Sequence, residues 1–222
     1  MDSIRALILY QDHHLVVCNK PAGMPVQEDP TGDASLHRIV QAYCKKDLFL
    51  VHRIDRPVSG IVVFARNKDA VADISAQQAD KRFQKQYLVV VEKKSLDPQG
   101  SLRNKLVHST KTKKAYVQEE GDGKASELHY EILHELDRYL VLKVELSTGR
   151  FHQIRAQLAH AGLPVKGDVK YGARRGNKDR SIGLHAWKLN FFHPSTHMPL
   201  TLEAPLPEND LWPVVQKLLH PA

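Results

Sequence analysis

The sequence has little cysteine, no long apolar run and no targeting pattern at its start. Its two cysteines, Cys18 and Cys44, each lie in an apolar-patterned segment, which argues against a disulfide framework and predicts two core residues. No apolar stretch approaches the roughly 20 residues that a membrane helix needs. Residues 1–5 lack the basic-then-apolar order of a signal peptide. We therefore expect a cytoplasmic protein that does not enter a membrane.

Metal-binding patterns are absent, although histidine is abundant. The 13 histidines include no His-Glu-x-x-His pair, and the adjacent His13 and His14 do not share a face. The cysteines also lack the spacing of a zinc site, so we expect no metal. Residues 52–55 read His-Arg-Ile-Asp, a loose match to a kinase catalytic loop. The asparagine, the Gly-rich loop and the Asp-Phe-Gly segment of kinases are missing, which sets phosphoryl transfer aside.

Acidic residues are outnumbered, since 32 Lys and Arg against 25 Asp and Glu give a net charge of +7. The resulting pI of about 9.3 is typical of proteins with a polyanionic partner. The basic residues gather in two stretches that we interpret as loops: Arg103, Lys105, Lys111, Lys113 and Lys114, then Lys166, Lys170, Arg174, Arg175, Lys178 and Arg180. A run of charge is usually a solvated face, but two basic loops also fit a surface that follows phosphates.

The segment 52–66 places one carboxylate between two arginines, just ahead of an apolar run. Pro57 and Gly60 predict a loop, and residues 61–65 predict a buried strand, so we expect Asp55 on a loop braced by the core. Nearby guanidinium groups favour an ionised carboxylate even where burial disfavours it. Asp55 is then available as a nucleophile or base. The alternative is that Asp55 pairs with an arginine merely to order a turn.

Hydrophobic periodicity and turn residues predict both strands and helices. The length of 222 residues and the 42% hydrophobic content suit a sizeable core, and no linker divides the chain, so we expect a single domain over residues 1–222. Turns are expected at 97–104 and 119–124. The expected strands cover about 12–20, 61–65, 86–92, 127–133, 139–146, 184–192 and 200–204. Ser35 can cap a helix through about residue 45, and Asn67 or Asp69 can begin a second helix that runs to about residue 82. Two further helices are expected at about 154–161 and 208–219. This pattern predicts an α+β fold with a mixed, mostly antiparallel sheet flanked by helices.

Several segments, in a shared order, resemble the RluA-type pseudouridine synthases, which isomerise uridine to pseudouridine in structured RNA. Residues 15–23 resemble the first block of that family, and 52–60 resemble its His-Arg-Leu-Asp-x-x-Thr-Ser-Gly signature. The strand with the family tyrosine is matched at 85–87, and the arginine block at 148–155. The later matching segments are 162–168, 171–172, 184–186 and 204–207. The resemblance covers nearly the whole chain and implies the pseudouridine synthase catalytic domain as its fold.

The sequence departs from the family pattern in places. Ile54 replaces the commoner leucine, which nearly conserves volume, and Val58 stands where threonine is common, which loses a hydroxyl. The first block begins by about Asp12, so we expect a short form without the small S4-like N-terminal RNA-binding domain of many relatives. Target binding then rests on the catalytic domain and on its basic loops, where we expect RNA contacts from Lys111, Lys113, Lys114, Arg174 and Arg175.

The resemblance implies a role for each of five residues. Asp55 matches the essential carboxylate, which either attacks C1′ of the target nucleotide or removes the C2′ proton. Arg155 matches the arginine that pairs with this aspartate, and Tyr87 the tyrosine that stacks on the flipped base. Arg53 matches the arginine that fills the space vacated by the base, and Leu184 is expected in the apolar wall. The ordinary alternatives are that Tyr87 is a core aromatic residue, that Arg53 pairs with an acidic residue on the surface and that Arg155 is a cation on the surface of a helix.

The implied partner is structured RNA, either a tRNA or a ribosomal RNA stem-loop, bound by a monomer. No cofactor is needed because the reaction is an isomerisation. Two alternatives remain open from the residues alone. One is a non-catalytic RNA-binding or RNA-folding protein on the same scaffold, and the other is hydrolysis of a nucleoside bond by the same carboxylate.

Overall fold

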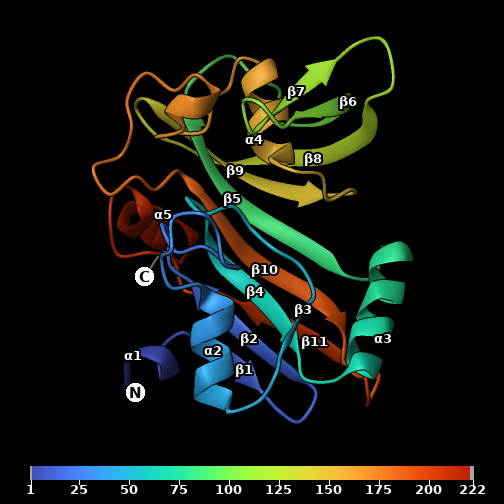
Figure 1. Ribbon diagram of the computed structural model, residues 1–222. Coiled ribbons are helices and arrows are strands. Elements are labelled where there is room, and N and C mark those ends of the chain that lie inside the picture. Colours follow the sequence, from blue (N-terminus) through green and yellow to red (C-terminus); the bar gives the residue numbers. More distant parts are fainter. Residues whose placement is uncertain (1, 221–222) are drawn as a thin grey trace. The chain divides into compact units, whose positions relative to one another are not determined.

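The computed structural model describes residues 2–220, and the chain divides into two compact units. Unit 1 combines the segment up to Lys85 with His185–Pro207, and unit 2 combines Gln86–Leu184 with the segment from Glu208 onward. The colours of Figure 1 follow the chain through both units. The expectation of a single domain over residues 1–222 stays a prediction.

Unit 1 is a sheet with helices packed on it. Its strands occur in the order β1-β2-β4-β10-β11, with β3 paired to the end of β4. Strands β4 and β10 run parallel, whereas β1 with β2, β2 with β4 and β10 with β11 are antiparallel. The elements are α1 (Asp2–Arg5), β1 (Ile8–Gln11), β2 (Leu15–Lys20), α2 (Leu36–Cys44), β3 (Phe49–Leu50), β4 (Ser59–Ala65), α3 (Lys68–Ala79), β10 (Leu184–Phe192) and β11 (Pro199–Glu203).

Strand β4 is buried on both faces because a helix covers each of them. Alternate residues of a strand point to opposite faces. Val63 and Ala65 join Ile74 of α3 in one buried cluster. Phe64, which points the other way, stacks on His37 of α2 with ring centroids 5.5 Å apart. The continuous apolar run of this strand therefore reflects a central position between two helices.

The two covering helices begin at the side chains that the sequence indicates. Ser35 accepts a hydrogen bond from the Arg38 amide at 3.2 Å, and Asn67 accepts one from the Ala70 amide at 2.8 Å. Each satisfies one of the amides that a helix start leaves unpaired. The start predicted at Ser35 is confirmed, and of Asn67 and Asp69, the two starts that the sequence allows, the structure has Asn67.

The start of β4 is fixed tightly against β10. Gly60 has a φ of 112°, and a Cβ at this position would collide with the backbone of Ala186. Next to it, the Ser59 hydroxyl and His185 Nδ1 lie 2.8 Å apart in a buried hydrogen bond. Burial lowers the pKa of His185 to about 4, so the ring is neutral at pH 7. This rigid contact follows directly after the loop that carries Asp55.

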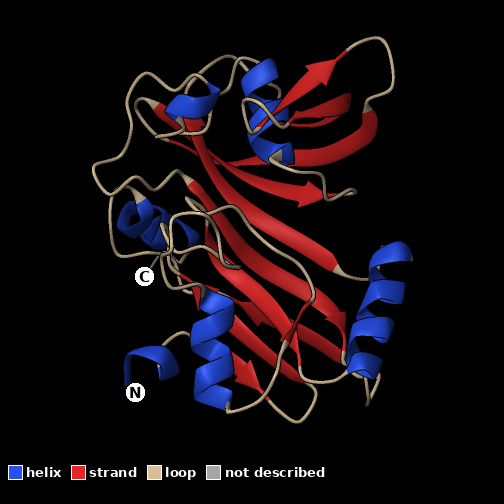
Figure 2. Cartoon of the chain, viewed as in Figure 1, coloured by secondary structure: helices blue, strands red, loops and turns tan. Residues whose placement is uncertain are grey.

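Unit 2 is an antiparallel sheet in the order β5-β9-β8-β6-β7. Its strands are β5 (Gln84–Glu92), β6 (Gln99–Ser109), β7 (Lys114–Gln118), β8 (Lys124–Glu135) and β9 (Tyr139–Leu146). Its helices are α4 (Gln153–His160), the short 3-10 helix η1 (Val169–Tyr171) and α5 (Trp212–Leu219). Figure 2 shows the strands in red and the helices in blue. The predicted α+β class with a mostly antiparallel sheet is confirmed.

The turn expected at 97–104 is wrong, because β6 begins at Gln99 and pairs with β8. Gly100 suggested the turn. It lies opposite Tyr130 instead, and the Tyr130 ring occupies the space where a Cβ would stand. The glycine therefore serves close packing within a strand.

Candidate functional site

The loop between β3 and β4 carries Asp55 on a buried base. Ile54 and Val58 are both buried on either side of it. The Val58 amide donates to the Asp55 carbonyl at 3.0 Å, which closes a turn around Pro57. Asp55 itself is half-buried. The sequence prediction of a loop braced by the core is confirmed, and the catalytic role of Asp55 stays a prediction.

The two arginines that flank Asp55 in sequence each bind side chains of the segment 27–33. Arg56 Nη1 donates to Asp29 at 3.2 Å and to Thr31 at 2.8 Å, and Arg56 also pairs closely with Asp33. Arg53 is exposed and donates to Gln27 at 3.1 Å. Arg56 therefore fixes the loop from its exposed side, while Arg53 keeps most of its guanidinium in solvent.

Lys20 supports the same loop from beneath. It lies at the end of β2 with no exposed surface, and its ammonium donates to three backbone carbonyls: Pro21 at 2.9 Å, Met24 at 2.8 Å and Arg56 at 3.1 Å. Three donors with three acceptors satisfy a buried ammonium group. The Arg56 carbonyl follows Asp55 by one residue, so Lys20 joins the turn after β2 to the carboxylate-bearing loop.

Burial lowers the pKa of Lys20 to about 7, although the neighbouring Asp55 carboxylate acts in the opposite direction and Arg56 lowers it further. The ordinary value of 10.5 applies to the unfolded chain. Between these two pH values the unfolded chain binds more protons than the folded protein. The free energy of unfolding should therefore rise with pH across this window. Below it, Lys20 is protonated in both states and adds no pH dependence.

Replacing Lys20 by methionine should lower the free energy of unfolding by about 1–3 kcal/mol at pH 7, because the Pro21 and Met24 carbonyls lose their donor. The stability lost on mutation should grow from pH 7 towards pH 10, by at most about 1.4 kcal/mol per pH unit. Urea denaturation of both proteins at pH 6.5 and pH 9 measures the difference. A difference that is equal at the two pH values would contradict the lowered pKa.

Unit 2 contributes a buried ion pair at Arg155. This side chain projects from the first turn of α4, and its Nε and Nη2 donate to the two oxygens of Asp168 at 2.7 and 2.9 Å. The side chains of Arg155 and Asp168 are only 4% and 1% exposed. The Arg155 guanidinium also lies 4.9 Å from the centre of the Tyr171 ring. A bidentate pair of this kind fixes the plane of the guanidinium as well as its position.

Tyr171 joins α4 to β7 through its hydroxyl. It accepts a hydrogen bond from the Ala115 amide at 2.8 Å and lies 2.8 Å from His152 Nδ1. Burial and the positive charge of Arg155 lower the pKa of His152 to about 3. The neutral ring at pH 7 can therefore accept the tyrosine proton at Nδ1. His152 has a left-handed φ of 51° at the start of α4, held in place by this contact.

Gln153 orders the turn before Arg155. Its carbonyl oxygen accepts from Thr148 Oγ1 at 2.8 Å and from the Arg150 amide at 2.9 Å, and its amide group donates to the Glu127 carbonyl at 3.0 Å. In the segment 148–155, which the sequence indicates as the arginine block, Gln153 therefore joins the turn before α4 to the first turn of that helix, which carries Arg155.

Two further predicted site residues are buried in strands. Tyr87 lies on β5 opposite Val144 of β9 and is 7% exposed. Leu184, the first residue of β10, is 3% exposed. Their proposed contacts with a flipped base stay predictions.

The basic residues differ in setting. Lys111 and Lys113 are exposed in the turn between β6 and β7, while Lys114 is half-buried with its ammonium 5.8 Å from the Tyr171 ring centre. Arg174 and Arg175 are exposed in the loop after η1. The first basic stretch is therefore mainly a hairpin of strands rather than a loop, because Arg103 and Lys105 lie on β6. The second is a loop as predicted, except that Lys170 lies on the short helix η1.

The predicted site residues come from both units. Asp55 and Arg53 belong to unit 1, and Tyr87, Arg155 and Leu184 belong to unit 2. The pairing of Arg155 with Asp55 stays a prediction. The sequence reasoning did not identify Asp168 as a partner of Arg155 or the three hydrogen bonds of Lys20. Asp168 could have been noticed in the sequence, because it lies in the segment 162–168 that matches the family.

Neither a metal centre nor a membrane helix is found in the described part of the chain. No group of three or more His, Cys, Asp or Glu side chains among residues 2–220 could hold a metal ion. No helix in that range is long and apolar enough to span a membrane.

Comparison with known proteins identifies the family. The sequence profile described as RNA pseudouridylate synthase matches residues 14–160. The ribosomal large subunit pseudouridine synthase C of Buchnera aphidicola subsp. Baizongia pistaciae is 32% identical over 212 residues, which cover 90% of this chain and 67% of that protein. The ribosomal large subunit pseudouridine synthase D of Xylella fastidiosa is 32% identical over 221 residues, covering 91% of this chain and 66% of that protein.

A solved structure shows the same fold. The human RNA pseudouridylate synthase domain containing 1 protein matches with a TM-score of 0.76 and 21% identity, over 96% of this chain and 94% of that one. The chain belongs to the RNA pseudouridylate synthase family, whose members are isomerases that act on uridine in RNA. It spans about two thirds of the length of the two bacterial relatives.

Proposed function

We propose that this protein converts specific uridines of large-subunit ribosomal RNA to pseudouridine, with Asp55 as the essential carboxylate. The observation that carries the proposal is the family match over residues 14–160, which contains Asp55, Tyr87 and Arg155. The choice of ribosomal RNA rests on the names of the two bacterial relatives, and tRNA is the second substrate class. The protein acts as a monomer in the cytoplasm and needs no cofactor.

The reaction exchanges one bond of the ribose for another. The C1′–N1 bond breaks, the uracil rotates, C1′ bonds to C5, the C5 proton leaves and N1 takes up a proton. Positive character develops on the ribose as the first bond breaks, and a carboxylate close to C1′ stabilises it. Asp55 acts either by attack at C1′ or as the base at C2′.

The other site residues act on the base. A uridine within a stack must be extruded before its C1′ is accessible, at a cost of a few kcal/mol. The exposed guanidinium of Arg53 fills the vacated space, since its plane can stack and donate hydrogen bonds together. Tyr87 stacks on the flipped base, and Leu184 lines the apolar wall. Arg155, held by Asp168, orients Asp55.

RNA binding draws on unit 2. The exposed side chains of Lys111, Lys113, Arg174 and Arg175 contact phosphates, with Lys114 at the base of the hairpin. Displacement of counterions from the phosphates makes such binding sensitive to salt. A flat dependence of affinity on salt would contradict this role.

The deciding experiment is a pseudouridine map of total RNA from the source organism with and without this gene. Loss of one ribosomal RNA signal on deletion, restored by the wild-type gene, supports the proposal and names the target. Loss of a tRNA signal would instead assign the second substrate class. If the map is unchanged and the purified protein does not modify total RNA of the deletion strain, the protein is not a pseudouridine synthase. Its function would then be RNA binding without catalysis. Release of free uracil would indicate hydrolysis.

A further inference from the structure

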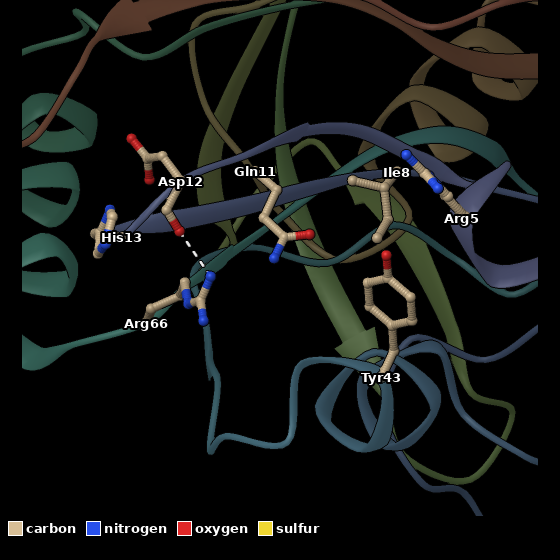
Figure 3. A pocket seen from close by; sticks show the side chains of 7 residues that line it. All are labelled: Arg5, Ile8, Gln11, Asp12, His13, Tyr43 and Arg66. Carbon is tan, nitrogen blue, oxygen red and sulfur yellow. Dashed lines mark hydrogen bonds between the residues drawn. The ribbon is translucent and has the colours of Figure 1, made fainter. Parts of the chain in front are cut away.

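Unit 1 contains a pocket that is lined by none of the site residues described above. It has a volume of about 570 Å³ and lies between α1, β1, the turn after β1, α2 and the end of β4 (Figure 3). The lining residues are Arg5, Ile8, Gln11, Asp12, His13, Tyr43 and Arg66. Most of them are cationic or neutral hydrogen-bonding groups.

Arg66 is held in place at one edge of this pocket. Its backbone amide donates to the His14 carbonyl at 2.8 Å, and its Nη1 donates to the Asp12 carbonyl at 2.7 Å. Figure 3 shows this second bond as the dashed line. Within residues 2–220, the buried Arg66 Nε has no hydrogen-bond partner. The guanidinium is therefore fixed in direction but not fully satisfied.

Among the described residues that line the pocket, Asp12 is the only acidic one, and its carboxylate is bound by other groups. It accepts from the amides of His14 and Leu15, both at 2.7 Å, and pairs with His193 Nε2 at 2.6 Å. Burial raises the pKa of Asp12, but these hydrogen bonds outweigh it and hold the pKa at about 2. In Figure 3 the carboxylate points away from Arg66. Arg66 therefore binds the backbone carbonyl of Asp12 and not its carboxylate.

Neither arginine of the pocket is paired with a carboxylate among the described side chains. Arg5 is exposed at the end of α1. Gln11 and Tyr43 add neutral donors, and the Tyr43 hydroxyl points towards Ile8 in the right half of Figure 3. Two guanidinium groups and neutral donors around an open pocket match the chemistry of a phosphate group.

We propose that this pocket binds a phosphodiester group of the RNA substrate, at a nucleotide other than the target. The inference rests on the proposed function, since RNA is the polyanion on which the family acts. Its effect is on affinity, because the pocket contains none of the residues assigned to the reaction. It would give unit 1 a contact with the RNA backbone in addition to the basic residues of unit 2.

The test compares Arg5→Gln, Arg66→Gln and the double variant with Arg38→Gln. Arg38 lies on α2, is 76% exposed and approaches Glu28 only to 3.9 Å, so its replacement removes the same charge from the same unit at little cost. RNA binding is measured by filter binding at several salt concentrations, with fragmented ribosomal RNA from a deletion strain as the probe. Turnover at saturating RNA and thermal midpoints are measured on the same samples.

Arg5→Gln and the double variant should bind about three- to tenfold more weakly at low salt, and the slope of log affinity against log salt should fall by about 1 for each phosphate that is no longer neutralised. Turnover at saturating RNA should equal that of the wild type, and Arg38→Gln should behave as the wild type. If Arg66 variants do not fold, Arg5→Gln alone decides. Equal binding by Arg5→Gln and Arg38→Gln, with an active wild type, would overturn the inference.

Two other results separate this inference from the proposed function. A wild-type protein that neither binds nor modifies RNA would refute the proposed function itself. Binding of uridine monophosphate that depends on Arg5, without any dependence of RNA affinity on Arg5, would assign the pocket to a free nucleotide and overturn the RNA contact.

Discussion

Replacing Asp55 by asparagine should abolish pseudouridine formation, with a loss of at least about 10³-fold in the single-turnover rate. The amide keeps the size of the side chain but cannot carry the negative charge that stabilises the ribose as the glycosidic bond breaks. Asp55 lies on a turn whose bracing comes from Ile54, Val58 and Lys20. The substitution should therefore leave that support in place. Quenched-flow turnover on the mapped ribosomal RNA fragment measures the rate.

RNA affinity distinguishes this outcome from a damaged fold. Removing a negative charge beside a polyanion should leave the affinity of Asp55→Asn unchanged or slightly higher. Asp47→Asn makes the same chemical change at an exposed position in unit 1 and should retain full activity. Turnover by Asp55→Asn within tenfold of the wild type would remove Asp55 from the chemistry. It would favour a role in which the carboxylate only orders the turn.

The sequence pattern is sufficient where local physics decides the structure. Ser35 and Asn67 indicate helix starts through their own side chains, and both hydrogen bonds form. The apolar run 61–65 indicates a buried strand, and helices on both faces of β4 account for it. These features depend on neighbouring residues, so they can be found in the sequence without knowledge of the rest of the fold.

Contacts between distant segments are where sequence reasoning fails. Gly100 indicates a turn by composition, but the ring of Tyr130 on another strand makes it a strand residue. Lys20 looks like an ordinary strand end. Only the approach of the Arg56 carbonyl, 36 residues away, makes it a buried support of the Asp55 loop. Tertiary pairing overrides local preference in both cases.

One departure from the family signature has a structural reason. Val58 stands where threonine is common, and the structure buries it to 2% exposure. A hydroxyl there would need a hydrogen-bond partner, whereas the valine methyl groups need only packing. Valine therefore suits the apolar environment beneath the loop. The hydrogen bond from the Val58 backbone amide to the Asp55 carbonyl does not depend on the side chain.

Replacing Asp168 by asparagine should lower the free energy of unfolding by about 3–5 kcal/mol, because it leaves the buried Arg155 guanidinium without the Asp168 charge. For a chain of this size the melting midpoint should fall by about 6–20 °C. The control is Glu135→Gln, which breaks an exposed pair with Lys93 in the same unit. Its expected cost is about 0–1 kcal/mol. Calorimetry on the three proteins measures the difference, and equal midpoints for both variants would contradict a buried pair.

The double variant Arg155→Met with Asp168→Leu separates stability from function. It removes both charges together and fills the space with apolar side chains, so much of the stability lost in Asp168→Asn should return. Activity should not return, because the proposed role of Arg155 in the reaction requires its guanidinium group. Recovery of both stability and turnover would show that Arg155 serves only the packing of unit 2. Recovery of stability alone would place Arg155 in the reaction, with Asp168 as the residue that positions it.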